Sequence, residues 1–332
     1  MTEKRKERAK TYAASEHSAS FSLALCLLLL ILFLAQSERL NEWMQNSLSL
    51  CANVLIPSLF PFLILSDLIL SAGAADRLGA VVAKPFRALL GISGAGVSAV
   101  LLGMLCGFPI GARMTVSLYE QGRIDRGEAE RLLAFCSIPS PAFLIGSVGV
   151  SLLGSRSQGI LLYAVNVTSS FLVCLFSYLL SPKKKREPSV LAESPPKASL
   201  SIAQFTRAIA NSANGMLHIC AFVLAFSCII RLLGLLLSYL PLSLPPFFST
   251  LLFGFFELTG GMTYAAQLPQ GLSLLACAII SGWSGLSVHA QIVSLSDTRP
   301  LSFRPYLLSK TLSAALNALI VGCILLWERA TL

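Results

Sequence analysis

The sequence predicts an all-α polytopic membrane protein with two inverted repeats, each a helix, a re-entrant hairpin, a broken helix and a helix, preceded by one extra N-terminal transmembrane helix. Composition is the first reason. Of 332 residues, 55% are hydrophobic and 12% charged, with a mean hydropathy of +0.74, whereas soluble domains carry roughly 25% charged residues. Apolar stretches of about 18 or more residues, each able to cross a hydrocarbon core about 30 Å thick, recur along the chain.

The charge pattern excludes several function classes. The net charge of +9 lies in short basic loops beside apolar stretches, which is the positive-inside pattern of membrane proteins and not a nucleic-acid signal. The nine Cys residues form no CxxC pair, so we expect small buried or lipid-facing residues and no metal site. The common hydrolase, metalloprotease and nucleotide-binding motifs do not occur. We therefore expect no enzyme and no cofactor beyond a coupling ion, either a proton or sodium.

The N-terminal segment supports two interpretations. Residues 1–18 are rich in Lys and Arg and are predicted to be cytoplasmic, with residues 19–36 as the first transmembrane helix. The same pattern resembles a signal peptide, with Ala35-Gln36-Ser37 as a cleavage site. An uncleaved helix is favoured because the apolar run is long for a signal peptide and further spans follow at once.

The first repeat is predicted over residues 40–182. A helix at about 47–72 leads to basic residues, and the next apolar stretch starts and ends beside charged segments, so both its ends face the cytoplasm. It is therefore predicted to be a re-entrant hairpin that turns at Gly107-Phe108-Pro109-Ile110-Gly111, where glycine permits the turn and proline donates no hydrogen bond. A span broken at Ser137-Ile138-Pro139-Ser140-Pro141 follows, and then a helix over 159–180.

The second repeat is predicted over residues 206–332, after a Pro-, Ser- and Lys-rich cytoplasmic linker at 183–205. Its expected elements are a helix at 208–238, a hairpin at 247–268, a broken helix at 272–296 and a helix at 306–327. Arg299, Arg304 and Lys310 are expected to mark the cytoplasmic side. This topology makes the second half inverted relative to the first.

Short sequence echoes support the repeat. The segment LLGMLCGFPIGARMT pairs loosely with LLFGFFELTGGMT, and both broken helices contain Ser-x-x-Ser followed by Pro or Gly. Unwound backbone survives in a membrane only where it is buried or lines a cavity, where half-helix ends attract ions. Four such breaks are predicted to converge on one polar site of an alternating-access transporter.

The candidate site residues come from these breaks and from the charged residues at depth. The candidate substrate-binding residues are Gly107, Pro109, Gly111, Arg113, Ser137, Ser140, Glu257, Thr259, Ser281 and Ser284, and Glu257 and His289 are candidates for carrying or relaying a coupling proton.

Each charged candidate has an alternative interpretation. An ionisable group inside a span costs at least about 2.5–3.5 kcal/mol unless it is paired or hydrated, so Glu257 is expected to bind substrate, to carry a proton, or to cap its own short helix. Arg113 is expected either to balance Glu257 or an anionic substrate, or to extend to the inner face. His218 and His289 are expected to be relays or packed histidines, Asp67 an interface residue, and Arg231 an interfacial anchor.

The motifs GFPIGAR, YEQGRIDRGEAERLLAFCSIPSPAFLIGSVG, ELTGG and SGWSGLSVHAQI resemble a known family. From about residue 40 to 327 the chain is similar to the YlbJ (SpoVV) family of sporulation integral membrane proteins, within the nucleoside-recognition Gate domain group. The resemblance implies a role in spore cortex formation and export of dipicolinic acid from the mother cell across the outer forespore membrane. The wider group resembles concentrative nucleoside transporters, whose hairpins and broken helices form the substrate site.

The resemblance to nucleoside transporters is partial at the site. Their first hairpin is followed by Gly-Gln-Thr-Glu, which reads the base, but this chain has Gly107-Phe108-Pro109-Ile110 there. Their Asn-Glu-Phe resembles Phe256-Glu257-Leu258, and their Asn-x-x-Ser resembles the Ser281-x-x-Ser284 segment. The expected partners are the lipid bilayer and a small anionic solute, with homo-oligomerisation left open. The alternatives are a nucleoside transporter, a non-transporting membrane component needed for the spore cortex and, least favoured, an intramembrane enzyme.

Overall fold

The computed structural model describes residues 23–24, 26–72, 83–180, 201–239, 244–295 and 301–331, and all regular secondary structure within these ranges is helical. Five helices are long and apolar enough to cross a membrane, or six if one bent pair forms a single span. The chain is therefore an all-helical polytopic membrane protein, as predicted. The helices are α2 (Ser37–Leu50), the π-helical η1 (Cys51–Leu55), α3 (Ile56–Ser71), α5 (Gly94–Cys106), α6 (Phe108–Glu120), α7 (Arg126–Cys136), the π-helical η2 (Ala142–Leu152), α8 (Arg156–Leu180), α9 (Ile202–Ser238), α10 (Pro246–Phe256), α11 (Leu258–Ala265), α12 (Gln270–Trp283), α13 (Leu286–Val293) and α14 (Phe303–Thr331), with further helices at Cys26–Ala35 and Ala83–Leu90.

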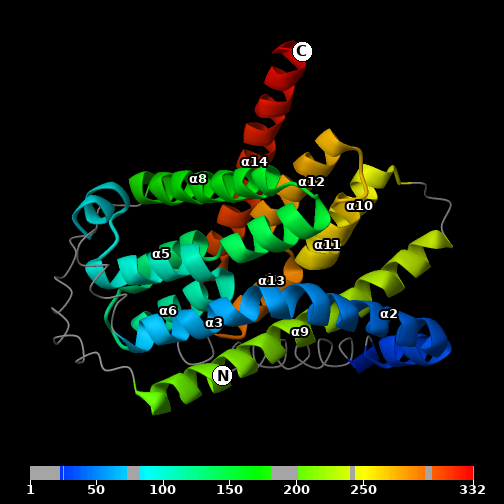
Figure 1. Cartoon of the computed structure of the whole chain (residues 1–332), viewed down its shortest axis with the longest axis horizontal. Helices are drawn as coiled ribbons and strands as arrows, with labels where there is room; N and C mark the ends of the chain where they lie inside the picture. Colours follow the sequence, from blue (N-terminus) through cyan, green and yellow to red (C-terminus); the bar gives the residue numbers. More distant parts are fainter. Residues whose placement is uncertain are drawn as a thin grey trace, which may run out of the picture.

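Two long antiparallel helices form one side of the molecule. Figure 1 shows α2 to α3 and α9 crossing this side together, with the remaining helices on the other side of them. Cys228 Sγ lies 3.1 Å from Met44 Sδ near one end of the pair, and Asn211 donates a 2.8 Å hydrogen bond to Asp67 near the other. The first of these helices begins at Ser37, ten residues before the predicted start at 47, because its polar first turns carry good helix formers that hydropathy does not detect.

The first predicted reversal is present at Gly107, which has a φ of +88°. Helices α5 and α6 fold back on each other there. Gly103 and Gly111 meet across the turn, since a Cβ atom on Gly111 would lie 2.7 Å from the Gly103 Cα. The same two glycines contact Cys136, the last residue of α7. Glycine is required at both positions because any side chain would push the two helices apart.

The second reversal, at Glu257, repeats this arrangement. Helices α10 and α11 fold back on each other, and Gly254 contacts Gly261 across the turn. The side chain of Ile280, near the end of α12, packs against both glycines. In each half a glycine pair thus closes a hairpin directly on the residue that precedes the Ser-x-x-Ser break.

Both predicted helix breaks are present. Helix α7 ends at Cys136, and the chain is irregular from Ser137 to Ser140 before η2 begins. Helix α12 ends at Trp283, and the chain turns through Ser284 and Gly285, with φ of 76° and 84°. Among the described residues, Ser284 is the one non-glycine with positive φ, a strained conformation that surrounding structure must hold in place.

Each break is held by a polar side chain from the other half. Asn166 of α8 donates a 2.8 Å hydrogen bond to the Ser281 hydroxyl, and Lys310 of α14 donates to the carbonyl oxygen of Ser137. Both donors lie 29 residues after the first serine of their own half's break (137 to 166, and 281 to 310). Lys310, which was expected to mark the cytoplasmic side, has a side chain that is only 1% exposed and lies inside the helix bundle.

One further helix was not predicted, and some predicted features lie outside the described residues. The helix Ala83–Leu90 is bent by 94° relative to α5. Ser93 at this bend caps α5 through its hydroxyl, and its backbone N–H donates to the buried Glu128 carboxylate at 2.6 Å. The basic N-terminus (1–18), the start of the first helix (19–22), most of the linker (183–200) and Arg299 lie outside the described ranges.

Candidate functional site

Three cavities lie in order along the antiparallel pair formed by α9 and by α2 to α3. The first, here named the Asp67 cavity, is lined by α9 over 211–219 and by α3 over 63–67. The middle cavity follows over 219–223 and 55–63. The Arg231 cavity is lined over 227–231 and 46–50. Because the two helices run antiparallel, the cavities form a row along the length of both.

The middle cavity brings the two hairpin turns together. Gly107 comes from the first turn, Glu257 and Thr259 come from the second, and Ser140 comes from the first break. Ser287 and Gln291 of α13 add polar atoms to a wall that is otherwise apolar. Its free volume is about 30 Å³, which holds roughly two or three water molecules. The cavity is therefore closed to any organic solute in this conformation.

Glu257 separates the middle cavity from the Arg231 cavity and lines both. Its side chain is 2% exposed. The carboxylate accepts hydrogen bonds from the backbone N–H groups of Thr259 at 2.9 Å and of Gly260 at 2.5 Å. It therefore caps α11, where the first-turn N–H groups and the helix dipole stabilise negative charge. Capping was one of the three roles expected for this residue.

Of the four serines at the breaks, only Ser140 lines a cavity described above, and its hydroxyl also accepts from the Phe143 N–H at 3.1 Å. Ser281 donates to the Ala278 carbonyl at 3.0 Å while it accepts from Asn166. Ser284 donates to the Ser281 carbonyl at 3.2 Å. The Ser137 hydroxyl is buried and has no partner within the described part of the chain. The Ser281 and Ser284 hydroxyls therefore stabilise the second break in this conformation.

Arg113 does not pair with Glu257. Its side chain is exposed and lines the Asp67 cavity with Asn211 and His218. Arg113 and Glu257, both described, form no ion pair with each other. The structure thus separates the two charges that the sequence suggested as partners. Of the remaining first-hairpin candidates, Pro109 lies in the first turn of α6, and Gly111 is enclosed in the hairpin contact.

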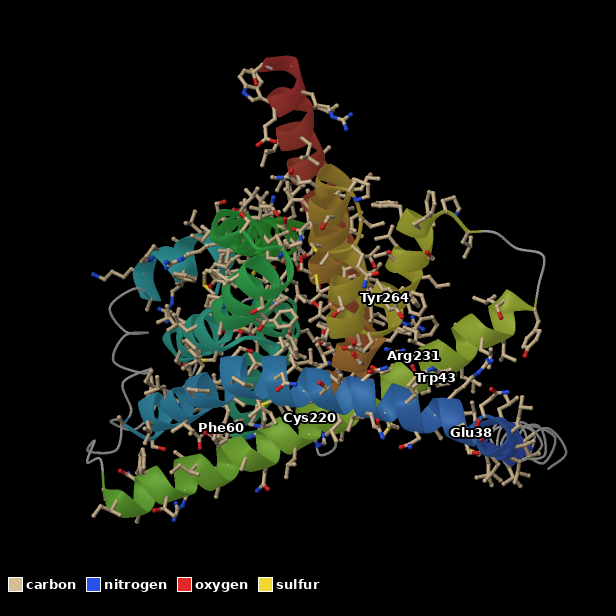
Figure 2. The ribbon with its side chains drawn as sticks, turned by 45° about the vertical axis from the view of Figure 1, so that its right-hand side comes forward. Glu38, Trp43, Phe60, Cys220, Arg231 and Tyr264 are labelled. Atoms are coloured by element: carbon tan, nitrogen blue, oxygen red, sulfur yellow. The ribbon has the colours of Figure 1, made fainter. Side chains whose placement is uncertain are left out.

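Arg231, which was expected to be an interfacial anchor, lines the Arg231 cavity. Arg231 shares a cavity of about 240 Å³ with Glu257, Tyr264, Gln267 and Asn46. Figure 2 shows Arg231 on α9 close to where Tyr264 projects from α11. The sequence feature that could have indicated this position is the spacing of Ser227 and Arg231, which are four residues apart and share a helix face.

His289 lies in an aromatic cluster and lines none of the three cavities. Its Nδ1 atom is 2.8 Å from the Tyr306 hydroxyl, and its ring packs edge-on against Trp283. The Trp283 indole stacks on Phe255 and donates to the Phe255 carbonyl at 2.9 Å. The Nε2 atom of His289 is buried with no partner among the described residues. His289 therefore links α13 to α14 in this conformation.

Comparison with known proteins identifies a relative along most of the chain. The sequence is 29% identical, over an alignment of 324 residues, to the sporulation integral membrane protein YlbJ of Bacillus subtilis (strain 168), covering 86% of this chain and 77% of that protein. No family model matches the chain, and no solved structure matches it. The helical membrane fold and this extended similarity lead to one conclusion: the chain is a homologue of the sporulation integral membrane protein YlbJ.

Proposed function

We propose that this chain is a secondary transporter that moves a small anion across a membrane by alternating access. The observation that carries the proposal is the middle cavity, where both hairpin turns and the first helix break meet between two larger spaces. Irregular backbone at membrane depth is tolerated where it is buried or lines a cavity, and transporters use it to bind solutes. The solute would contact Gly107, Ser140, Glu257 and Thr259.

The paired arrangement of hairpins and breaks in the two halves supports this proposal. The glycine pairs Gly103–Gly111 and Gly254–Gly261 each pack on the end of a helix that breaks, and the two breaks receive their donors from opposite halves. Residues 40–182 and 206–332 are the proposed repeats, with α5–α6 and α10–α11 as re-entrant hairpins. Two repeats related in this way allow one half to move against the other around a fixed site.

The arginines of the flanking cavities favour an anion, and the first hairpin lacks the groups that read a nucleoside base. The first hairpin contributes Cys106, Gly107 and Phe108 to the middle cavity, and none of them has the amide or carboxylate group that reads a base. Guanidinium groups lie in the flanking cavities instead, Arg113 on one side and Arg231 on the other. An arginine binds a carboxylate through two parallel hydrogen bonds. By resemblance, the proposed solute is dipicolinate, exported from the mother cell across the outer forespore membrane.

Transport also requires an opening motion, because the middle cavity holds no more than a few water molecules in this conformation. We also propose that the N-terminus lies on the cytoplasmic side. Glu257 is the proposed residue for coupling, either by binding the solute or by carrying a proton, and the coupling ion remains a choice between a proton and sodium.

Solute flux tests the proposal directly. Purified protein is reconstituted in liposomes, and uptake of labelled dipicolinate and, separately, of labelled uridine is measured with a proton gradient, a sodium gradient or no gradient. Protein-free liposomes provide the control. The expected result is saturable uptake of dipicolinate but not of uridine. Uptake of uridine alone would favour a nucleoside transporter, and uptake of neither solute would favour a non-transporting membrane component.

A further inference from the structure

Lys310 is an ionisable amine enclosed in the helix bundle. It is one of the largest fully buried side chains of the described structure. No carboxylate within the described ranges forms an ion pair with it. Cys136 and His289 are titratable groups that interact with it electrostatically, and neither supplies a formal counter-charge as a thiol or a neutral imidazole. A charge buried in a membrane protein without compensation is costly, so it calls for a specific explanation.

The partner of Lys310 is a backbone carbonyl at a broken helix. The ammonium donates to the oxygen of Ser137, the residue that caps the C-terminal end of α7. The last carbonyls of a helix have no intrahelical partners and form the negative end of its dipole. A positive charge is therefore stabilised at this position by the backbone alone.

The other half shows that a charge is not needed to hold such a break. Asn166 occupies the corresponding place, 29 residues after Ser137, as Lys310 lies 29 residues after Ser281. Asn166 holds the second break with a neutral amide that donates to the Ser281 hydroxyl. Holding the break therefore requires only a donor, and an ionisable amine in place of an amide is an additional property of the first break.

Unwound carbonyls and half-helix C-terminal ends are the groups that coordinate sodium ions in transporters with broken helices. We propose that the Lys310 ammonium is a built-in cation that occupies the place of a coupling metal ion at the first break, so that this break binds no sodium. The ammonium satisfies the same carbonyl oxygen and would repel a second cation brought close to it. Any consequence of this replacement for ion coupling rests on the proposed transport function. Whether the break binds a cation does not depend on that function.

Thermal unfolding of the purified full-length protein tests the proposal without transport. The unfolding midpoint is measured in sodium chloride and in choline chloride of equal concentration, and again with added methylammonium. The wild-type midpoint is expected to be the same in both salts. Lys310→Ala should lower the midpoint by several degrees in choline, and sodium or methylammonium should restore part of the loss, because either cation can fill the vacated place beside the carbonyl.

Lys310→Met is the matched variant, because methionine removes the charge but fills most of the space. It should be destabilised like Lys310→Ala, yet neither cation should rescue it. A sodium-specific rise in the wild-type midpoint would overturn the proposal, and so would equal responses of Lys310→Ala and Lys310→Met to the cations. If Lys310→Ala does not fold, the wild-type comparison and the destabilisation of Lys310→Met decide the question. If the wild-type protein moves no dipicolinate but the unfolding midpoints respond to the cations as expected, the proposed transport function is wrong. The proposal that Lys310 takes the place of a metal ion would still stand.

Discussion

The side-chain amide of Asn166 in α8 donates a 2.8 Å hydrogen bond to the hydroxyl of Ser281, 115 residues away in the sequence. Both groups are buried, and the bond joins the last helix of the first half to the helix break of the second. The contact fixes the position of the second break relative to the first half. The contact of Lys310 with Ser137 similarly joins a helix of the second half to the break of the first.

This contact predicts energetic coupling between the two residues. Asn166→Ala and Ser281→Ala should each lower the thermal stability of the purified protein, and the double variant should lose less than the sum, because one bond is lost in all three. Side-chain hydrogen bonds inside membrane proteins are worth about 0.6 kcal/mol on average. A double-mutant cycle on unfolding measures the coupling. Strict additivity of the two losses would show that the contact contributes nothing.

The glycine pairs predict a second set of effects. Gly111→Ala and Gly261→Ala should each destabilise the protein by about 1–3 kcal/mol, since the added methyl group overpacks a closed hairpin. Gly322→Ala in α14 is the matched control, because a Cβ atom there would meet nothing within 4 Å beyond its chain neighbours and the backbone of its own helix. Unfolding midpoints in detergent give the comparison. Equal midpoints for all three variants would contradict the closed-hairpin geometry.

The hairpins and breaks were predictable from the sequence because their signals are local. Gly107 and the residues around Glu257 combine glycine with an interruption of an apolar run, and both Ser-x-x-Ser segments are followed by Pro or Gly. These residues disfavour continuous helix whatever surrounds them. The turn at Gly107 and the break between α12 and α13 were accordingly located to within a few residues.

The locations of the charged residues could not be predicted in the same way, because they depend on tertiary contacts. Lys310 was expected only to mark the cytoplasmic side with Arg299 and Arg304, and its contact with a carbonyl of the other half was not foreseen. Arg113 looked like the partner of Glu257, but the two side chains line different cavities. Hydropathy and charge patterns indicate how far along a predicted span a residue lies. They do not show which other helix its side chain contacts.

Arg231 and Arg113 are predicted to differ in their effect on solute affinity. Arg231→Gln should raise the half-saturating concentration of dipicolinate about 10- to 100-fold, which corresponds to about 1.5–3 kcal/mol for hydrogen bonds to a charged group. Arg113→Gln should raise it less, because the exposed guanidinium is screened by water and salt. Concentration-dependent uptake in liposomes measures both. A larger effect at Arg113 would place the anion-binding side at the Asp67 cavity.

Glu257 lies between the middle cavity and the Arg231 cavity, and it is the residue that we propose to handle the transported solute or its coupling proton. The most direct measurement is the initial rate of dipicolinate uptake by liposomes that contain wild-type, Glu257→Gln or Glu328→Gln protein at equal density. Glu328 is exposed near the end of α14 and serves as the control. The account predicts at least about a tenfold lower rate for Glu257→Gln, which is about 1.4 kcal/mol in the barrier, and an unchanged rate for Glu328→Gln. Uptake by Glu257→Gln at the wild-type rate would contradict the account and leave this carboxylate as a cap for α11 alone.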